Sequence, residues 1–201
     1  RLQPLGHLST CGDKQAGHGL QPENADFEGF FDPKGAPMAS QFLCHFIRRH
    51  EGVRAQLYQD HLGYWTIGVG HFVDRKKGQW CDDELARRLT HHGFRLSPRM
   101  VQAYLDDDIE RAQSSARRLY APVWSQLTEA RQAALIAMAF NLGHAGLAGF
   151  KNLRAAIIAQ DWRQAQAEAL DSRWAKQVPH RAHETAAILA SGQPPDWWPL
   201  K

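Results

Sequence analysis

The chain has 201 residues, of which 43% are hydrophobic and 22% are charged, and its formal net charge is +3 at pH 7. These are ordinary values for a globular protein, and they exclude a collagen-like or intrinsically disordered chain. A chain of this length can fold as one domain, or as two lobes that share a core, without cross-links. No apolar run reaches the roughly 18 to 20 residues that a membrane-spanning helix requires.

Charge is distributed unevenly along the chain. Residues 1–108 contain 13 Lys and Arg against 14 Asp and Glu, whereas residues 109–201 contain 11 against 7. The second half is therefore cationic, and a cationic surface concentrates anionic polymers such as cell walls, membrane surfaces and nucleic acids. Scattered solvated Lys and Arg would give the same count, and the net charge is too small to indicate nucleic-acid binding.

The cysteines do not form a recognisable framework. Cys11, Cys44 and Cys81 are an odd number, with no CxxC pair and no metal-ligand spacing. We expect free thiols, with a single disulfide as the alternative. Nothing resembles a signal peptide, and the chain begins with Arg1, so we expect a piece of a longer protein.

Residues 1–38 show no sustained helical or strand period and are rich in turn-forming residues, which predicts an irregular extension or linker. This segment contains a short apolar cluster, Phe27, Phe30 and Phe31. Two alternatives stay open for the cluster: it docks on the following domain, or the segment is disordered.

A helix is predicted from Ser40 to about Glu51, because four apolar residues recur at helical spacing. They are Phe42, Leu43, Phe46 and Ile47. The following stretch, residues 55–71, is rich in aromatic and β-branched residues interrupted by glycines, which indicates a small twisted hairpin or meander.

The rest of the chain is helical in pattern. A short helix is expected over Asp82–His92, and Ser97 with Pro98 is a strong start signal for a long helix that runs to about Arg118. Further helices are expected over Gln132–Leu142, Gly149–Gln160, Trp162–Ala169 and His180–Ala190, with turns at Gly143, Gly146 and Gly192. The fold class is therefore α+β and predominantly helical, with a small sheet lobe and a helical lobe between which a ligand would bind.

Three residues around the predicted sheet carry chemistry. Glu51 stands at a helix end, Asp60 follows nine residues on, and Thr66 six residues after that. Glycosidic hydrolysis requires one carboxylic acid that protonates the leaving oxygen and a second carboxylate on the opposite face. Taken singly, the three residues would suit a surface carboxylate, a turn and a strand.

The stretch from Glu51 to His71 resembles the active-site region of the phage-type lysozymes, glycoside hydrolase family 24. The similarity continues in three further blocks, residues 134–143, 146–152 and 172–182, and so covers roughly residues 40–193 in the family's order. The resemblance implies that Glu51 is the general acid, that Asp60 positions or activates the nucleophilic water, and that Thr66 holds that water.

The resemblance also implies a two-lobed fold and further site residues. A lobe with a three-stranded sheet, residues 39–96, would be joined by a connecting helix, 97–118, to a helical lobe, 119–201. His71 and Asp108 match an ion pair between the small lobe and the long helix, and Arg181 matches an Arg beside the catalytic Glu. The implied sugar contacts are Gly70, Phe72, Phe140, Asn141, Asn152 and Leu153.

Several residues leave alternatives open. The chain departs from the best-known family member at Phe72, Asn141 and Leu153, and Phe140 would also suit the core. Trp174 is expected in the core, and Trp197 and Trp198 are expected to pack on the helical lobe rather than to bind a carbohydrate. The remaining histidine groups, His91 with His92 and His180 with His183 and Glu184, do not match a zinc-site spacing.

The expected function is that of an endo-acting N-acetylmuramidase, which lyses peptidoglycan in the periplasm or cell wall, needs no cofactor and no metal, and acts as a monomer. The alternatives are a binding module that has lost catalysis and a chitin-directed hydrolase. The setting is either a phage endolysin or the toxin domain of a secreted effector, in which case an immunity protein would be its partner.

Overall fold

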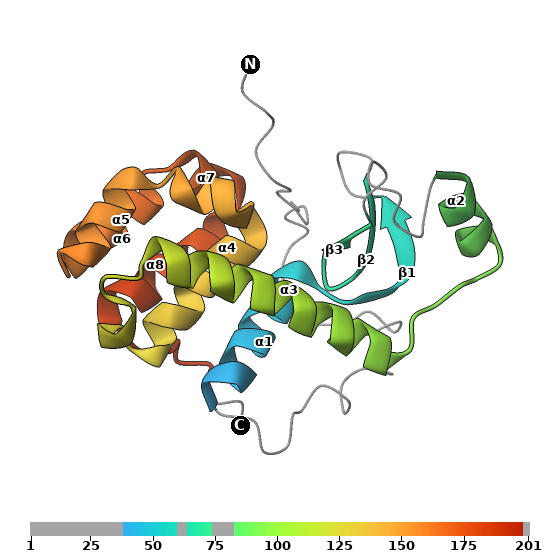
Figure 1. Cartoon of the computed structure of the whole chain (residues 1–201), viewed down its shortest axis with the longest axis horizontal. Coiled ribbons are helices and arrows are strands. Elements are labelled where there is room, and N and C mark those ends of the chain that lie inside the picture. Colours follow the sequence, from blue (N-terminus) through green and yellow to red (C-terminus); the bar gives the residue numbers. More distant parts are fainter. Residues whose placement is uncertain (1–37, 60–63, 74–82, 199–201) are drawn as a thin grey trace. The chain divides into compact units, whose positions relative to one another are not determined.

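The computed structural model describes residues 38–59, 64–73 and 83–198. These residues fall into two compact units. The helical unit comprises residues 38–46 and 109–198, and the sheet unit comprises residues 47–59, 64–73 and 83–108. Figure 1 labels the elements in chain order, and they confirm the expected fold class: a mostly helical chain with one small antiparallel sheet.

Four sequence-based expectations fall on residues that the structure does not describe. They concern Asp60, the apolar cluster Phe27, Phe30 and Phe31, and the cysteines Cys11 and Cys81, all of which lie outside the described residues. The expected boundary between the extension (residues 1–38) and the following domain lies at the edge of the undescribed residues 1–37. Cys44 lies half-buried in the first helix.

The first helix, α1, spans Met38–Glu51. Its four apolar residues are all buried, as the helical spacing requires. The helix ends where predicted, because Gly52 has a left-handed φ of +71° and its N–H donates to the Arg48 carbonyl at 2.9 Å. Only glycine adopts this conformation without steric strain. Glu51 is thereby fixed as the last helical residue.

The sheet unit contains three antiparallel strands, β1 (Arg54–Gln59), β2 (Trp65–Gly68) and β3 (His71–Phe72), in the order β1-β2-β3. The central strand is buried along its whole length. Its Ile67 is fully inaccessible to solvent and belongs to the apolar core of this unit. The meander predicted from the sequence is therefore present.

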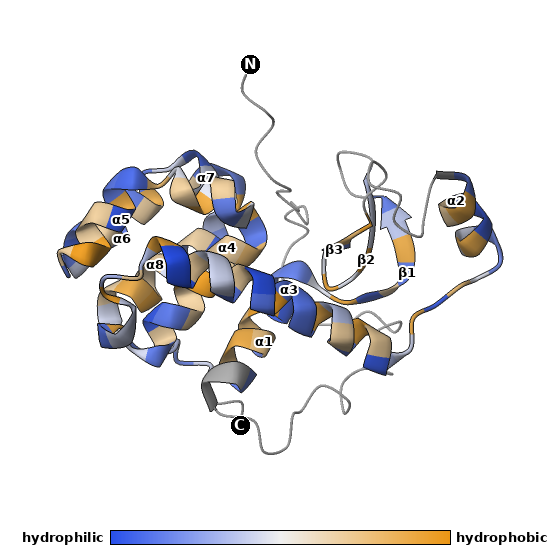
Figure 2. Cartoon of the chain, in the orientation of Figure 1, coloured by the Kyte–Doolittle hydropathy of each residue, from blue (hydrophilic) through white to orange (hydrophobic). Residues whose placement is uncertain are grey.

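Two helices follow the sheet, α2 (Asp83–His91) and α3 (Pro98–Leu119). The predicted start of α3 is confirmed, since Pro98 is its first residue and the Met100 N–H donates to Ser97 Oγ at 3.3 Å. Hydrophilic and hydrophobic residues alternate in bands along α3 in Figure 2, as expected for a helix with one buried side.

The helical unit contains a short 3₁₀ turn (Trp124–Gln126) followed by five helices. The helices are α4 (Glu129–Ala148), α5 (Lys151–Ile158), α6 (Trp162–Leu170), α7 (Arg173–Gln177) and α8 (Pro179–Ser191). Side-chain oxygens of Thr128, Asp161 and Ser172 cap the first turns of α4, α6 and α7. Gly192 ends α8 in a left-handed conformation, as predicted.

Most of α4 lies in the core of the helical unit. The helix breaks at Gly143, where φ is 68° and ψ is 174°, and this break confirms one predicted turn. No single helix among residues 38–59, 64–73 and 83–198 is long and apolar enough to cross a membrane. The pair α4 and α5 passes that test by length and composition only, and it is bent by 104°.

Several sequence-based expectations about this unit are corrected. The helix expected over Gln132–Leu142 is longer, Glu129–Ala148, because it resumes after the break at Gly143. The turn expected at Gly146 is wrong, because this residue lies inside the helical turn that follows Gly143. Gly146 serves packing instead: a Cβ there would approach the Leu142 Cβ to 2.9 Å. The helix α7 was not predicted, since its five residues are too few to show a hydrophobic period.

Candidate active site

Glu51 occupies the C-terminal end of α1, in the sheet unit, and is half-buried. Its Oε2 atom is shielded from solvent. Gly70, in the turn between β2 and β3, lies against this carboxylate: a Cβ on Gly70 would sit 3.5 Å from Oε2. The backbone of Gly70 has a φ of +69°, which disfavours any side chain at this position. The turn therefore places backbone, and no side chain of its own, against the Glu51 carboxylate.

Thr66 lies in the middle of the central strand of the same unit. It pairs with Tyr58 on one side and with Phe72 on the other, and it is 5% exposed. Its Oγ1 donates a hydrogen bond to the Tyr64 carbonyl at 3.2 Å. With its own proton engaged, the hydroxyl oxygen keeps lone pairs that can accept a hydrogen bond from a water molecule.

The second predicted carboxylate, Asp60, follows directly after β1 and lies outside the described residues. Its role and its distance from Glu51 therefore stay predictions. Two of the three predicted catalytic residues, Glu51 and Thr66, are described, and both belong to the sheet unit.

His71 and Asp108 are in contact within the sheet unit. The His71 Nδ1 and an Asp108 carboxylate oxygen lie 2.8 Å apart, and the two side chains are 15% and 19% exposed. The imidazole also stacks on Tyr104, with ring centroids 4.4 Å apart and an interplanar angle of 19°. The contact thus fixes β3 against the first part of α3.

The sugar contacts expected in the helical unit have different environments. Asn141 is buried, and its Oδ1 accepts a hydrogen bond from the Trp174 indole at 2.8 Å. Leu153 is also buried, whereas Phe140 is half-buried and Asn152 is exposed. Asn141 and Leu153 therefore have structural contacts of their own, and their role in sugar binding stays a prediction. Trp174 is 3% exposed, which confirms its predicted place in the core.

A cavity of about 480 Å³ lies in the helical unit beside these residues. Asn152, Leu153, Phe150 and Trp174 contribute to its wall, and the two aromatic rings meet edge to face with centroids 6.1 Å apart. Its charged lining residues are Lys151, Glu168, Asp171 and Arg173. A mainly apolar cavity of this volume with a few charged groups at its wall has the size and lining typical of a small-ligand site.

Arg181, which was predicted to lie beside Glu51, belongs to the helical unit. It lies in the first turn of α8 and is 5% exposed. The expected contact with Glu51 would join the two units, so it stays a prediction.

The aromatic residues near the C-terminus pack as predicted. Trp197 lies within ring-contact distance of Phe42 and Phe46 of α1, and its indole donates to Glu184 of α8 at 3.2 Å. Trp198 lies beside Phe42 and His45. Trp197 thus packs on α8 of the predicted helical lobe, whereas Trp198 contacts α1, whose first part the structure assigns to the helical unit and not to the small lobe expected over residues 39–96.

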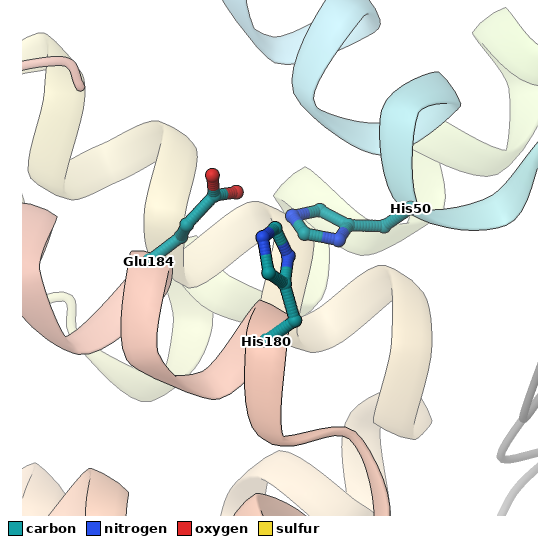
Figure 3. A group of neighbouring side chains, drawn as sticks. All are labelled: His50, His180 and Glu184. Atoms are coloured by element: carbon teal, nitrogen blue, oxygen red, sulfur yellow. The ribbon is translucent and has the colours of Figure 1, made fainter. Parts of the chain in front are cut away.

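Figure 3 shows His180 and Glu184 on successive turns of α8, together with His50 of α1. His180 and Glu184 both belong to the helical unit, whereas His50 belongs to the sheet unit. Two ligands on one helix are fewer than the three or four converging groups that protein zinc sites use. Neither unit by itself therefore assembles a metal centre from these residues.

The sequence was compared with known protein families. The model of the family described as phage lysozyme matches residues 48–187, which is more than half of the chain. The chain belongs to the phage lysozyme family. The match confirms the resemblance found in the sequence and, at the level of the family, supports a glycoside hydrolase that acts on peptidoglycan.

Three curated proteins illustrate this family relationship. The pre-baseplate central spike protein of Enterobacteria phage T4 is 28% identical over 75% of this chain, but the chain spans only 28% of that protein. Two probable T4-type lysozymes of Dictyostelium discoideum are 24% and 23% identical over 73% and 75% of this chain. The chain covers 92% and 94% of their lengths. The same segment therefore corresponds to a whole lysozyme in one case and to part of a larger protein in another.

Two features of this lysozyme-family site were not predicted. Tyr104 stacks on His71, and its position four residues before Asp108 on α3 places both side chains on one helix face, a signal that the sequence contained. Tyr64 contacts Phe72 edge to face at 5.3 Å. This second contact depends on strand pairing and had no comparable signal.

Proposed function

We propose that the chain is an endo-acting N-acetylmuramidase that hydrolyses the β-1,4 bond between N-acetylmuramic acid and N-acetylglucosamine with inversion. The observation that carries the proposal is the position of Glu51. A half-buried carboxyl at the end of α1 lies beside a glycine with no side chain, in the same unit as Thr66. Family membership supplies the substrate class.

In the proposed reaction, Glu51 donates its proton to the glycosidic oxygen as the bond from the anomeric carbon to that oxygen breaks. A water molecule held by Thr66 and Asp60 attacks the anomeric carbon from the opposite face. Asp60 takes up the proton released by that water and then returns it to solvent, while Glu51 is reprotonated from solvent. A direct attack by water inverts the configuration, in contrast to a mechanism with a covalent intermediate.

The glycan contacts carried over from the family belong to both units. Gly70 and Phe72 lie in the sheet unit, and Phe140, Asn141, Asn152 and Leu153 lie in the helical unit. The cavity beside Asn152 supports a ligand-binding role for the helical unit. Because Asn141 and Leu153 are both buried, we assign Leu153 to the wall of that cavity and Asn141 to holding Trp174, which lines it, rather than either to direct sugar contact.

We assign residues 39–201 to the lysozyme domain, since the family match at residues 48–187 lies wholly within it. Residues 1–38 are then an extension. The phage spike protein shows that a segment similar to this one occurs inside a larger phage protein. Whether the setting is a phage lysin or a secreted effector with an immunity protein stays a prediction, as does action in the periplasm.

The experiment that tests the proposed bond and stereochemistry is product analysis on purified peptidoglycan. A muramidase leaves muramic acid at the new reducing ends, which borohydride reduction and mass spectrometry identify. Inversion of a β-linkage yields the α-anomer first, and this can be followed by proton NMR. Reducing ends that carry only N-acetylglucosamine, or a β-anomer as first product, would contradict the proposal.

The same assay separates the alternative functions. A chitin-directed hydrolase would release reducing ends faster from chitin oligomers than from peptidoglycan. A binding module without catalysis would retain the glycan and release none. We expect faster release from peptidoglycan, because the substrate class follows from the family.

A further inference from the structure

The sheet has two chemically different faces. Cross-strand neighbours in a sheet point to the same side, and successive residues of one strand point to opposite sides. Ile67 and His71 are cross-strand neighbours, and His71 contacts Asp108 and Tyr104 of α3. Their face is therefore turned toward α3 within the sheet unit.

The opposite face carries Thr66 and its two cross-strand neighbours, Tyr58 and Phe72. Tyr64 directly precedes β2, and its ring contacts that of Phe72, which belongs to this face. Two aromatic residues, Tyr58 and Phe72, thus flank the residue whose hydroxyl we assign to the nucleophilic water, and Tyr64 lies against one of them.

The three rings are not equivalent. The guanidinium of Arg54 lies 4.5 Å from the centre of the Tyr58 ring and covers one of its faces. Tyr64 and Phe72 instead contact each other, with centroids 5.3 Å apart and an interplanar angle of 82°. Both are half-buried, so part of each ring is accessible to solvent. The pair therefore places two nearly perpendicular, partly accessible rings at the cross-strand neighbour of Thr66.

We propose that Tyr64 and Phe72 together form a stacking subsite for the N-acetyl amino sugar ring next to the scissile bond. This inference rests on the proposed function and deepens it, because family resemblance indicates Phe72 alone and says nothing of an aromatic pair. The C–H groups on one face of a pyranose ring are apolar and pack against an aromatic face. The second ring, held perpendicular, limits how the sugar can rotate on the first.

The Tyr64–Phe72 pair should affect KM, whereas the catalytic residues should affect kcat. The pair does not touch the reacting atoms, so it binds the glycan equally in the ground state and in the transition state. Loss of such uniform binding raises KM and leaves kcat unchanged. Removing either ring is expected to weaken glycan binding roughly 3- to 10-fold, the effect typical of one aromatic contact.

Leucine substitutions test the pair, because leucine keeps much of the apolar volume and removes the ring. We would measure kcat and KM on purified peptidoglycan for Y64L, F72L and the double variant. Phe94→Leu is the matched control, since Phe94 is another half-buried phenylalanine of the sheet unit outside the sheet. The expected result is a KM raised 3- to 10-fold in each single variant, with kcat within twofold of the wild type and the control unaffected.

Binding is measured separately in the catalytically inactive E51Q background by titration with N-acetylglucosamine oligomers of increasing length. The affinity gained on extending the oligomer should shrink in E51Q/Y64L and E51Q/F72L, and E51Q/Y64F should recover most of it. Unchanged oligomer binding in both folded leucine variants would overturn the inference, as would a fall in kcat at constant KM.

Two further readouts keep the test decisive. If a leucine variant does not fold, the ring-proton chemical shifts of Tyr64 and Phe72 are followed in E51Q during titration with chitotetraose. Saturable shifts support the subsite, and static ring signals during binding contradict it. If the wild type releases no reducing ends from peptidoglycan, the proposed function fails, whereas wild-type activity with unaltered leucine variants removes only the aromatic subsite.

Discussion

The His71 imidazole and the Asp108 carboxylate lie 2.8 Å apart and join the last strand of the sheet to α3. Because both side chains are less than one-fifth exposed, solvent screens this pair only weakly. A hydrogen bond to a charged group contributes about 1.5 to 3 kcal/mol to folding stability.

Asp108→Asn is therefore expected to lower the free energy of unfolding by about 1 to 3 kcal/mol, since the amide keeps the shape and loses the charge. Urea denaturation monitored by circular dichroism measures the change. Asp107→Asn is the control, because Asp107 is an exposed neighbour on α3, and it should stay within about 0.5 kcal/mol of the wild type. Equal effects of the two substitutions would show that the contact contributes nothing.

Gly70 and Gly93 offer a matched pair for testing the surroundings of Glu51. Both have a left-handed backbone, with φ of +69° and +68°, so alanine should destabilise each by about 1 kcal/mol. A Cβ on Gly70 would sit 3.5 Å from Glu51 Oε2, whereas a Cβ on Gly93 would meet no atom within 4 Å. We expect Gly70→Ala to reduce wall lysis and Gly93→Ala to leave it intact. Similar activity losses in both variants would indicate a general stability effect.

Tyr120 is completely buried, and its hydroxyl has no hydrogen-bond partner among the described residues. A buried hydroxyl without a partner costs free energy, so Tyr120→Phe is expected to raise the free energy of unfolding by about 1 kcal/mol at neutral pH. Thermal and urea denaturation measure this change. A destabilised variant would imply that the hydroxyl has a favourable contact.

Burial also raises the pKa of the Tyr120 hydroxyl above its ordinary value, while the nearby Arg154 partly opposes this rise. Above about pH 10 the unfolded chain loses this proton and the folded chain keeps it, so its contribution to stability declines as pH rises. The wild type should lose about 1.4 kcal/mol per pH unit relative to Tyr120→Phe in this range. Denaturation curves at pH 9 and pH 11 measure the difference, and parallel curves for the two proteins would contradict it.

Arg131 caps the C-terminal end of α8. Its Nε and Nη2 donate to the carbonyls of Leu189 and Ala190 at 2.9 and 3.0 Å, and its guanidinium lies 3.6 Å from the centre of the Trp162 ring. A lysine cannot reproduce this planar fork, so Arg131→Lys should lower the free energy of unfolding by about 1 to 2 kcal/mol. Arg117→Lys, at an exposed position of α3, is the control. No difference between the two variants in urea denaturation would rule out a stabilising cap.

The end of α1 and the start of α3 could be predicted because each depends on local chemistry. Gly52 ends α1 and Ser97 with Pro98 starts α3 through contacts within one helical turn, so the sequence contains the complete signal. Gly146 was misjudged because a glycine needed for close packing against Leu142 is indistinguishable, in sequence, from one needed for a turn.

The site could be predicted only in part for a related reason. Glu51 and Thr66 were singled out because their types and spacing match a known family, and their catalytic roles stay predictions. The ring contact of Tyr64 with Phe72 arises from pairing between strands, and the hydrogen bond from Trp174 to Asn141 joins residues 33 positions apart. Such contacts depend on which helices and strands pack together. The spacing of residues in the sequence does not reveal this packing.

The central claim is that Glu51 supplies the proton that cleaves the glycan. It is tested most directly by comparing the release of reducing ends from purified peptidoglycan by the wild type and by Glu51→Gln at equal concentrations of folded protein. We predict vigorous release by the wild type and a loss of at least about 100-fold in the variant, because general acid catalysis typically contributes that factor or more. Equal release by the two proteins would contradict the account.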